Sequence, residues 1–206
     1  MEPRCERSVG LPNTAGLAGF ATEWGYKMIE RHLRLCGIGV AGILLASPAM
    51  SQSTTAPSLS EGQIVKFLQT VNHGEITDAR MALRRSKDAD VKNFAKEMIK
   101  DHSTNEKTMA GLARQLKLKP ASSDATNSLL SEAKSSDQEL KAAKGTDFDK
   151  AYIEAQAKMH SDVANTIQTQ LEPAATNDQM KSALGETLST VQKHEKMAQD
   201  LSGKMQ

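Results

Sequence analysis

Residues 178–202 read DQMKSALGETLSTVQKHEKMAQDLS, and their apolar side chains recur mostly at steps of three and four. At about 100° per residue, this spacing forms one apolar stripe along an α-helix. The stripe contains Met180, Leu184, Leu188, Val191, Ala198 and Leu201. Thr187 and His194 lie within the same arc, and Asn177 is a suitable N-cap. The pattern predicts an amphipathic helix that presents a histidine to the protein interior.

Residues 89–116 show the same pattern and contain VKNFAKEMIKDHSTNEKTMAGLARQL from position 91. Asp88 is the predicted N-cap, and the helix is expected to end before Pro120, because proline restricts the residue that precedes it. The apolar stripe contains Val91, Phe94, Ala95, Met98, Met109, Leu112 and Leu116. His102 falls close to its centre, so this helix also predicts an inward histidine.

Two further helices are predicted at residues 59–86 and 147–171. The first starts with the capping box Ser58-Leu-Ser-Glu61, and Pro173 closes the second. The buried face of the first contains Ile64, Phe67, Leu68, Val71, Ala79 and Ala82, with Glu75 near its centre and His73 roughly opposite. The face of the second contains Phe148, Tyr152, Ala155, Met159 and Val163, and His160 flanks it.

The polar segment 121–144 is expected to form a long connection with a short extra helix around Leu129, Leu130, Ala133 and Leu140. The chain has 206 residues, of which 38% are hydrophobic and only 3% aromatic, a composition that favours helix. The sequence therefore predicts an all-α domain over 58–206, after a linker at 52–57.

The first 51 residues are typical of an N-terminal extension with a secretory signal. Lys27, Arg31 and Arg34 precede the apolar run LCGIGVAGILLA at 35–46, which is shorter than the roughly 20 residues that span a bilayer. Small residues before Gln52 predict cleavage near Ser51, with Met28 as an alternative start. We therefore expect a periplasmic or secreted protein; an uncleaved membrane anchor is the alternative.

Removal of this leader takes away both cysteines, Cys5 and Cys36, so the mature chain can form no disulfide. The leader carries five of the 26 Lys and Arg and four of the 25 Asp and Glu, which leaves 21 of each. This balance argues against a nucleic-acid partner. Glycine-rich phosphate loops, a Ser-His-Asp order and cysteine motifs are also missing, so no enzyme class is favoured.

Several segments of the chain resemble a known protein family. The segments Asn72-His-Gly-Glu75, Phe94-Ala-Lys-Glu-Met-Ile-Lys-Asp-His102-Ser and Phe148-Asp-Lys-Ala-Tyr152, followed by His160 and His194, are similar to the ferritin-like domain-of-unknown-function family of exported bacterial proteins. Its members are often labelled membrane or outer-membrane proteins. The resemblance implies a ferritin-like four-helix bundle with a long connection between its second and third helices, and no established activity.

Di-iron bundles use a Glu from each of two helices and a Glu-x-x-His from each of the other two. Glu75 can stand for one glutamate, but Ile99 and Val191 occupy the positions three residues before His102 and His194. Without those carboxylates, two cations would face each other with too little negative charge between them. A dinuclear iron centre is therefore not expected.

The polar residues near the midpoints of the predicted helices allow two interpretations. In one, Glu75, His102 and His194, with His160 as a fourth candidate, hold a single zinc or iron ion for metal storage or oxidant defence. In the other, which the sequence favours, the histidines form a structural polar layer with Glu75, Tyr152 or Asp101. The protein would then be a non-enzymatic envelope protein with a role in stress.

Overall fold

The computed structural model describes residues 58–205, and within that range the chain is all-helical, with no strand. The predicted leader, its cleavage site and the linker lie outside the described residues. The elements are α1 (Glu61–Arg85), α2 (Ala89–Gln115), α3 (Asp124–Ala142), α4 (Thr146–Thr166), a π-helical turn η1 (Ile167–Leu171), α5 (Glu172–Ala174) and α6 (Asp178–Lys204). Over residues 58–205, no helix is both long and apolar enough to cross a membrane.

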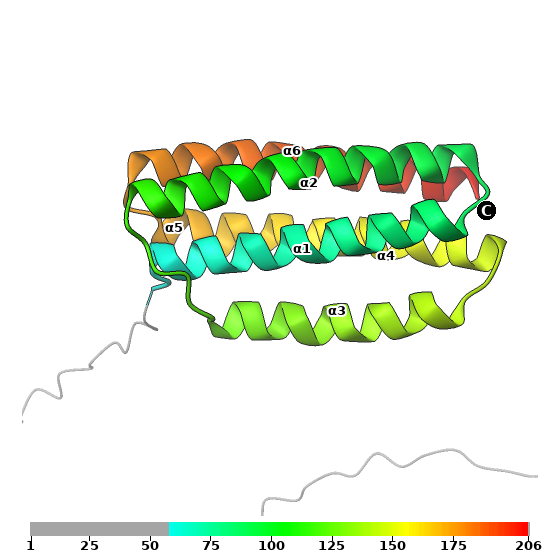
Figure 1. Ribbon diagram of the computed structural model, residues 1–206, viewed down its shortest axis with the longest axis horizontal. Coiled ribbons are helices and arrows are strands. Elements are labelled where there is room, and N and C mark those ends of the chain that lie inside the picture. Colours follow the sequence, from blue (N-terminus) through cyan, green and yellow to red (C-terminus); the bar gives the residue numbers. More distant parts are fainter. Residues whose placement is uncertain (1–57, 206) are drawn as a thin grey trace, which may run out of the picture. The chain divides into compact units, whose positions relative to one another are not determined.

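Four long helices, α1, α2, α4 and α6, surround the apolar core (Figure 1). The most extensive packing joins α1 to α2 and α4 to α6, and α2 also packs on α6. Helix α3 lies along the outside, against α1 and α4 (Figure 1). Helices α2 and α6 begin directly after Asp88 and Asn177, whose side chains accept hydrogen bonds from the backbone N–H groups of the first turns.

Two local predictions were wrong. The capping box of α1 is formed by Ser60 and Gln63, not by Ser58 and Glu61. Glu61 instead accepts hydrogen bonds from the backbone N–H groups of Thr176 and Asn177, at 3.1 and 2.6 Å, so it ties the start of α1 to the start of α6. The extra helix α3 is not short, because it continues for 19 residues.

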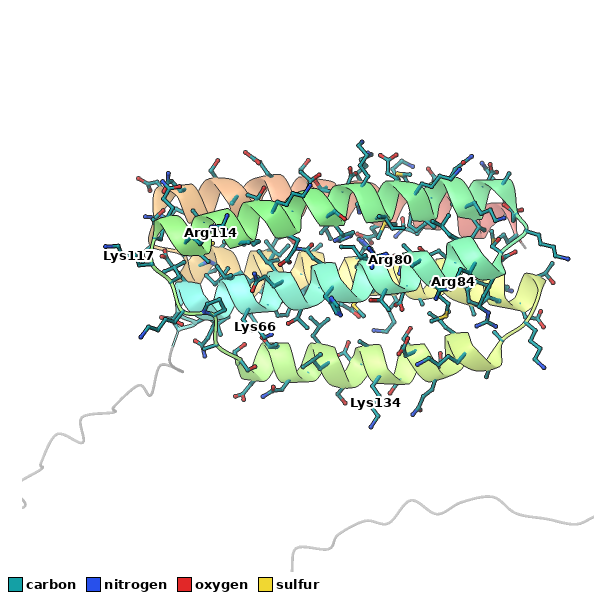
Figure 2. The ribbon with its side chains drawn as sticks, viewed as in Figure 1. Lys66, Arg80, Arg84, Arg114, Lys117 and Lys134 are labelled. Atoms are coloured by element: carbon teal, nitrogen blue, oxygen red, sulfur yellow. The ribbon has the colours of Figure 1, made fainter. Side chains whose placement is uncertain are left out.

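Arg85, at the end of α1, holds the connection between α3 and α4 in place. Its guanidinium group lies 4.2 Å from the centre of the Phe148 ring and donates hydrogen bonds to the carbonyl groups of Leu140, at 2.6 Å, and Ala143. Arg85 is therefore a structural contact between α1 and this connection, and not only a solvated charge at the end of a helix. Arg84 is exposed, as are Arg114 and Lys134, whose side chains are drawn in Figure 2.

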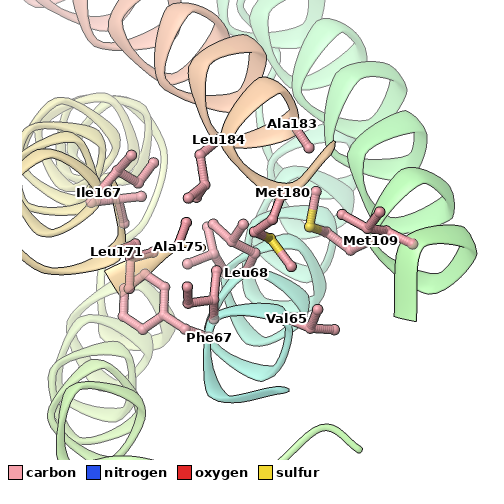
Figure 3. Close-up of a cluster of buried hydrophobic side chains, with 14 of the residues drawn as sticks. Val65, Phe67, Leu68, Met109, Ile167, Leu171, Ala175, Met180, Ala183 and Leu184 are labelled. Atoms are coloured by element: carbon pink, nitrogen blue, oxygen red, sulfur yellow. The ribbon is translucent and has the colours of Figure 1, made fainter. Parts of the chain in front are cut away.

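The apolar core is divided into two clusters along the helices. One, shown in part in Figure 3, contains Val65, Phe67 and Leu68 from α1, together with Met109, Ile167, Leu171, Met180 and Leu184. The other contains Ala79, Ala82, Phe94, Met98, Phe148, Tyr152, Ile153 and Ala198. On each of α1, α2, α4 and α6, buried polar residues lie between the residues of the two clusters. They are Asn72 and Glu75 on α1, His102 on α2, Gln156 and His160 on α4, and His194 on α6.

Gly62 lets the start of α1 pack closely against the segment that follows α2. A Cβ atom at this position would overlap the carbonyl oxygen of Lys119, whereas a Cβ atom at Gly74 in the same helix would meet nothing within 4 Å. Backbone contact continues at Ala121, whose N–H donates to the Gly62 carbonyl at 3.3 Å.

We expect Gly62→Ala to destabilise the fold by about 1–3 kcal/mol, because helix and loop must move apart. Gly74→Ala is the matched control and should stabilise by about 0.5–1 kcal/mol, since alanine reduces the entropy lost in a helix. Urea unfolding followed by circular dichroism measures both. Equal effects of the two substitutions would contradict the close approach at Gly62.

Candidate metal centre

Three histidines from three helices meet in the interior. His102 on α2, His160 on α4 and His194 on α6 are 3%, 1% and 0% exposed. Each offers a ring nitrogen such that all three nitrogens lie within 4.8 Å of one another, and the ring centres are 5.3–5.6 Å apart. Of the candidate ligands from the sequence, the structure thus clusters these three, and we call them the triad.

A chain of hydrogen bonds holds the His102 ring and sets its tautomer. Thr187 donates to the carbonyl of Ala183 at 2.7 Å, so its hydroxyl can only accept from the Asn105 amide, at 2.7 Å. The oxygen of Asn105 then accepts from the Asn72 amide at 2.8 Å, which leaves the Asn72 oxygen 3.0 Å from His102 Nδ1. Because a carbonyl oxygen cannot donate, the proton of His102 must be on Nδ1.

The other two rings are also held from outside the cluster. His160 Nδ1 lies 2.9 Å from the Gln156 carbonyl one turn earlier on α4, and a carbonyl can only accept. His194 Nε2 lies 3.1 Å from Asp101 Oδ2 on α2. A carboxylate also only accepts, so His160 carries its proton on Nδ1 and His194 on Nε2.

The three remaining ring nitrogens therefore carry lone pairs. His102 Nε2 faces His160 Nε2 at 3.4 Å, with no proton available on either atom. His194 Nδ1 is buried and has no hydrogen-bond partner. Buried polar atoms without partners are costly, and two facing lone pairs repel each other. An electron-pair acceptor between these atoms would remove both penalties.

Burial keeps the triad neutral. Loss of hydration lowers the pKa of His160 to about 4, and it lowers that of His194, with help from His160, to about 4. The same cause, with both neighbouring imidazoles, places the pKa of His102 well below its usual range. Partial burial raises the pKa of Asp101, but the bond from His194 and nearby lysine charges outweigh it, so Asp101 is a carboxylate. Neutral imidazole is the form that binds metals.

Glu75 is buried but lies outside the triad. It is 4% exposed, and its Oε2 atom has no hydrogen-bond partner. Burial raises the pKa of Glu75 to about 7. Asp78, one turn along α1, has its pKa raised to about 7 by burial and by Glu75. His73 is exposed, as its position opposite the apolar face predicted.

Several supporting residues were not found from the sequence. Asn72, Asn105 and the Gln156 carbonyl hold the rings, whereas Asp101, which accepts from His194, is one of the three polar-layer partners that the sequence analysis named. A signal for Asn72 was present, since it falls one residue from the apolar position Val71 on the buried face of α1. Asn105 and Asp101 act across helix pairs, and helical spacing carries no information on such contacts.

An all-helical protein with a buried triad of histidines is the class that this geometry defines. The chain belongs to the family described as a domain of unknown function, DUF4142, which matches residues 46–201. No match was found among curated proteins.

Two solved structures share the fold at low sequence identity. CopM in its Cu(II)-bound form is 14% identical, with a TM-score of 0.57 over 73% of this chain and 100% of CopM. A DUF305 protein from Streptomyces coelicolor, whose structure is titled that of a secreted protein, is 12% identical. Its TM-score is 0.59 over 70% of this chain and 93% of its own chain. At these identities the likeness concerns the fold alone.

Substitution of Glu75 tests its buried carboxyl group through the pH dependence of stability. The folded pKa of about 7 lies above the ordinary value of 4.5, so the folded state binds more protons between these values and loses stability as pH rises through them. Glu75→Gln removes this loss. We expect the variant to gain roughly 2–3 kcal/mol over wild type at pH 8 and little at pH 4.

Urea unfolding at the two pH values measures this difference. Glu154→Gln is a suitable control, because Glu154 is an exposed glutamate on α4. Equal stability of Glu75→Gln and wild type at pH 8 would show that the carboxyl group is hydrated and not buried.

Proposed function

We propose that this protein binds one transition-metal ion through the triad. The observation that carries the proposal is the direction of the hydrogen bonds: each histidine spends its only proton on an acceptor outside the cluster, at Asn72, Gln156 or Asp101. Metal-ligating histidines are usually held in this way, because the outer acceptor orients the ring and makes the inner nitrogen more basic. The inner atoms would be His102 Nε2, His160 Nε2 and His194 Nδ1.

The separation of two of the three rings supports the same proposal. Zinc binds imidazole nitrogens at about 2.0–2.1 Å, so two ligands of a tetrahedral or trigonal ion lie about 3.3–3.6 Å apart. His102 Nε2 and His160 Nε2 are 3.4 Å apart. The Asp101 carboxylate behind His194 supplies negative charge that offsets part of the cost of burying a cation.

Three imidazoles favour copper or zinc. The sequence-based set was Glu75, His102 and His194 with His160 as a fourth candidate, and the proposed set differs from it because Glu75 is left out. Two histidines with a carboxylate suit ferrous iron, whereas imidazole alone suits zinc and copper, and copper is the more tightly bound in the Irving–Williams order. CopM, one of the structural neighbours, was solved with Cu(II) bound, which adds support for testing copper first.

We also propose that the protein is exported and has a ferritin-like four-helix bundle formed by α1, α2, α4 and α6. The apolar run at 35–46 and the small residues before Gln52 support export, and a structural neighbour is described as a secreted protein. A bundle builds cofactor sites from inward side chains of facing helices, and the triad comes from three such helices. In the cell envelope, such a site would sequester copper or zinc.

Metal titration of the full chain, purified without an affinity tag, tests the metal proposal. We expect the wild type to bind one Cu²⁺ or Zn²⁺ per chain, and the ion should raise the unfolding temperature, because it binds only the folded state. His102→Ala and His160→Ala should each weaken binding by more than the roughly 10–100-fold typical of an outer-shell change. His73→Ala removes an exposed histidine of α1 and should bind like wild type.

The structural polar layer predicts a different outcome. If the triad only holds the helices in register, His102→Ala and His160→Ala each change the free energy of unfolding by the same amount with and without metal, and wild type binds only trace metal. That result would overturn the metal proposal. Loss of binding in His73→Ala would instead locate the ion at the surface.

The hydrogen bonds from Asn105 through Asn72 to His102 give a separate prediction. Asn72→Ala removes the acceptor of the Nδ1 proton and frees the ring to rotate, so we expect metal affinity to fall by roughly 10–100-fold while the triad remains. Isothermal titration of the variant measures the change. Asn165→Ala, at an exposed position of α4, is the matched control. Wild-type affinity in Asn72→Ala would mean that the amide does not orient the ring.

A further inference from the structure

A cavity between α2 and α6 leads from the surface to the triad. Its volume is about 190 Å³. Thr104 and Glu186, which line it, are exposed, whereas Asn72 and His102 are buried linings of the same cavity. The cavity therefore connects solvent with one of the three histidines, although the triad itself is almost completely buried.

The wall of this cavity has the chemistry of a path for cations. Its two charged linings, Asp101 and Glu186, are both acidic, and neither lysine nor arginine lines it. Lys100 and Lys193 pair with Asp101 from outside the lining set, at 3.5 and 3.8 Å. The cavity reaches His102, and its other polar linings are threonine hydroxyl and asparagine amide groups. They belong to Thr104, Thr108, Thr187, Thr190, Asn72 and Asn105. Acidic groups at a cleft raise the local cation concentration, and hard oxygen atoms can replace water around an ion.

A second cavity, between α1 and α3, does not lead to the triad. It has a volume of about 270 Å³ and is lined by Glu75 and Asp78, but also by Lys66, and by none of the three histidines. Its two acidic residues are only partly ionised near neutral pH, because burial raises the pKa of both Glu75 and Asp78 to about 7. A substitution that fills this second cavity is therefore a control for one that fills the first.

We propose that the metal ion reaches and leaves the triad through the cavity between α2 and α6. This inference rests on the proposed metal site. The ion is drawn in by Glu186 and Asp101, exchanges water for the hydroxyl and amide oxygens of the wall, and meets His102 first. His160 and His194 then complete its coordination.

The rate of Cu²⁺ uptake by the full chain tests this path. Thr190 lines the cavity on α6, and Thr190→Phe fills part of it without touching the triad. We expect uptake of Cu²⁺, followed in a stopped-flow instrument by its absorption, to slow by roughly tenfold or more. Release to a chelator should slow by a similar factor, because a barrier on the path acts in both directions. Ala133→Phe, which fills the cavity between α1 and α3, should leave both rates unchanged.

A second variant keeps the proposal testable if Thr190→Phe does not fold. Glu186→Gln should slow uptake several-fold at low salt and reduce its dependence on ionic strength, since an exposed charge acts over roughly a Debye length of 10 Å at 0.1 M salt. Wild-type rates in both variants would overturn the path, as would slowing by Ala133→Phe alone. Absence of Cu²⁺ binding by the wild type would instead remove the metal site itself, and the path with it.

Discussion

The arrangement of the interior depends on one constraint, which is the direction of the hydrogen bonds around three buried imidazoles. A carbonyl or carboxylate oxygen can accept a hydrogen bond but cannot donate one, and each ring has such an oxygen on its outer side, from Asn72, Gln156 or Asp101. The single proton of each neutral ring is therefore committed outward. His102 Nε2 and His160 Nε2 are left facing each other at 3.4 Å, and His194 Nδ1 has no partner.

This constraint explains why the apolar core is divided. A continuous core of leucine, methionine and phenylalanine side chains would be simpler to pack, yet one cluster of these residues ends at Val71 and Met109 and the other begins at Ala79 and Met98. The layer between them contains buried amides, a buried carboxyl group and the triad. Such a layer costs stability unless its polar atoms are satisfied, and three of its unsatisfied atoms belong to Glu75, Gln156 and His194. The cost is the expected mark of a binding site, since proteins depart from simple packing mainly where function requires it.

Much of the fold could be predicted from helical periodicity and capping residues. The predicted N-caps Asp88 and Asn177 are confirmed, and so is the all-helical class, because period and capping are local properties of the chain. The capping box at α1 was placed two residues too early, since several serines and acidic residues stand together there and only the turn geometry selects Ser60. The length of α3 was underestimated because few apolar residues mark it: Leu129 and Leu140 are buried, but Leu130 is 50% exposed.

The site was predicted in part. The inward directions of His102, His194 and Glu75 and the outward direction of His73 follow from each helix by itself. What periodicity cannot give is the rotation of one helix against the next, which brings His160 into the triad and places Glu75 beside Gln156 instead. The acceptors Asn72 and Asn105 were missed for the same reason, because their partners lie on other helices, and Asp101 was named only as one of three partners for the histidines.

The most direct test is a crystal structure of the full chain loaded with copper or zinc, with data collected at the absorption edge of the metal. The account predicts a single anomalous peak between the three rings, at about 2.0–2.1 Å from His102 Nε2, His160 Nε2 and His194 Nδ1. A peak only at a surface residue such as His73, or no peak within the triad at full metal occupancy in solution, would contradict it.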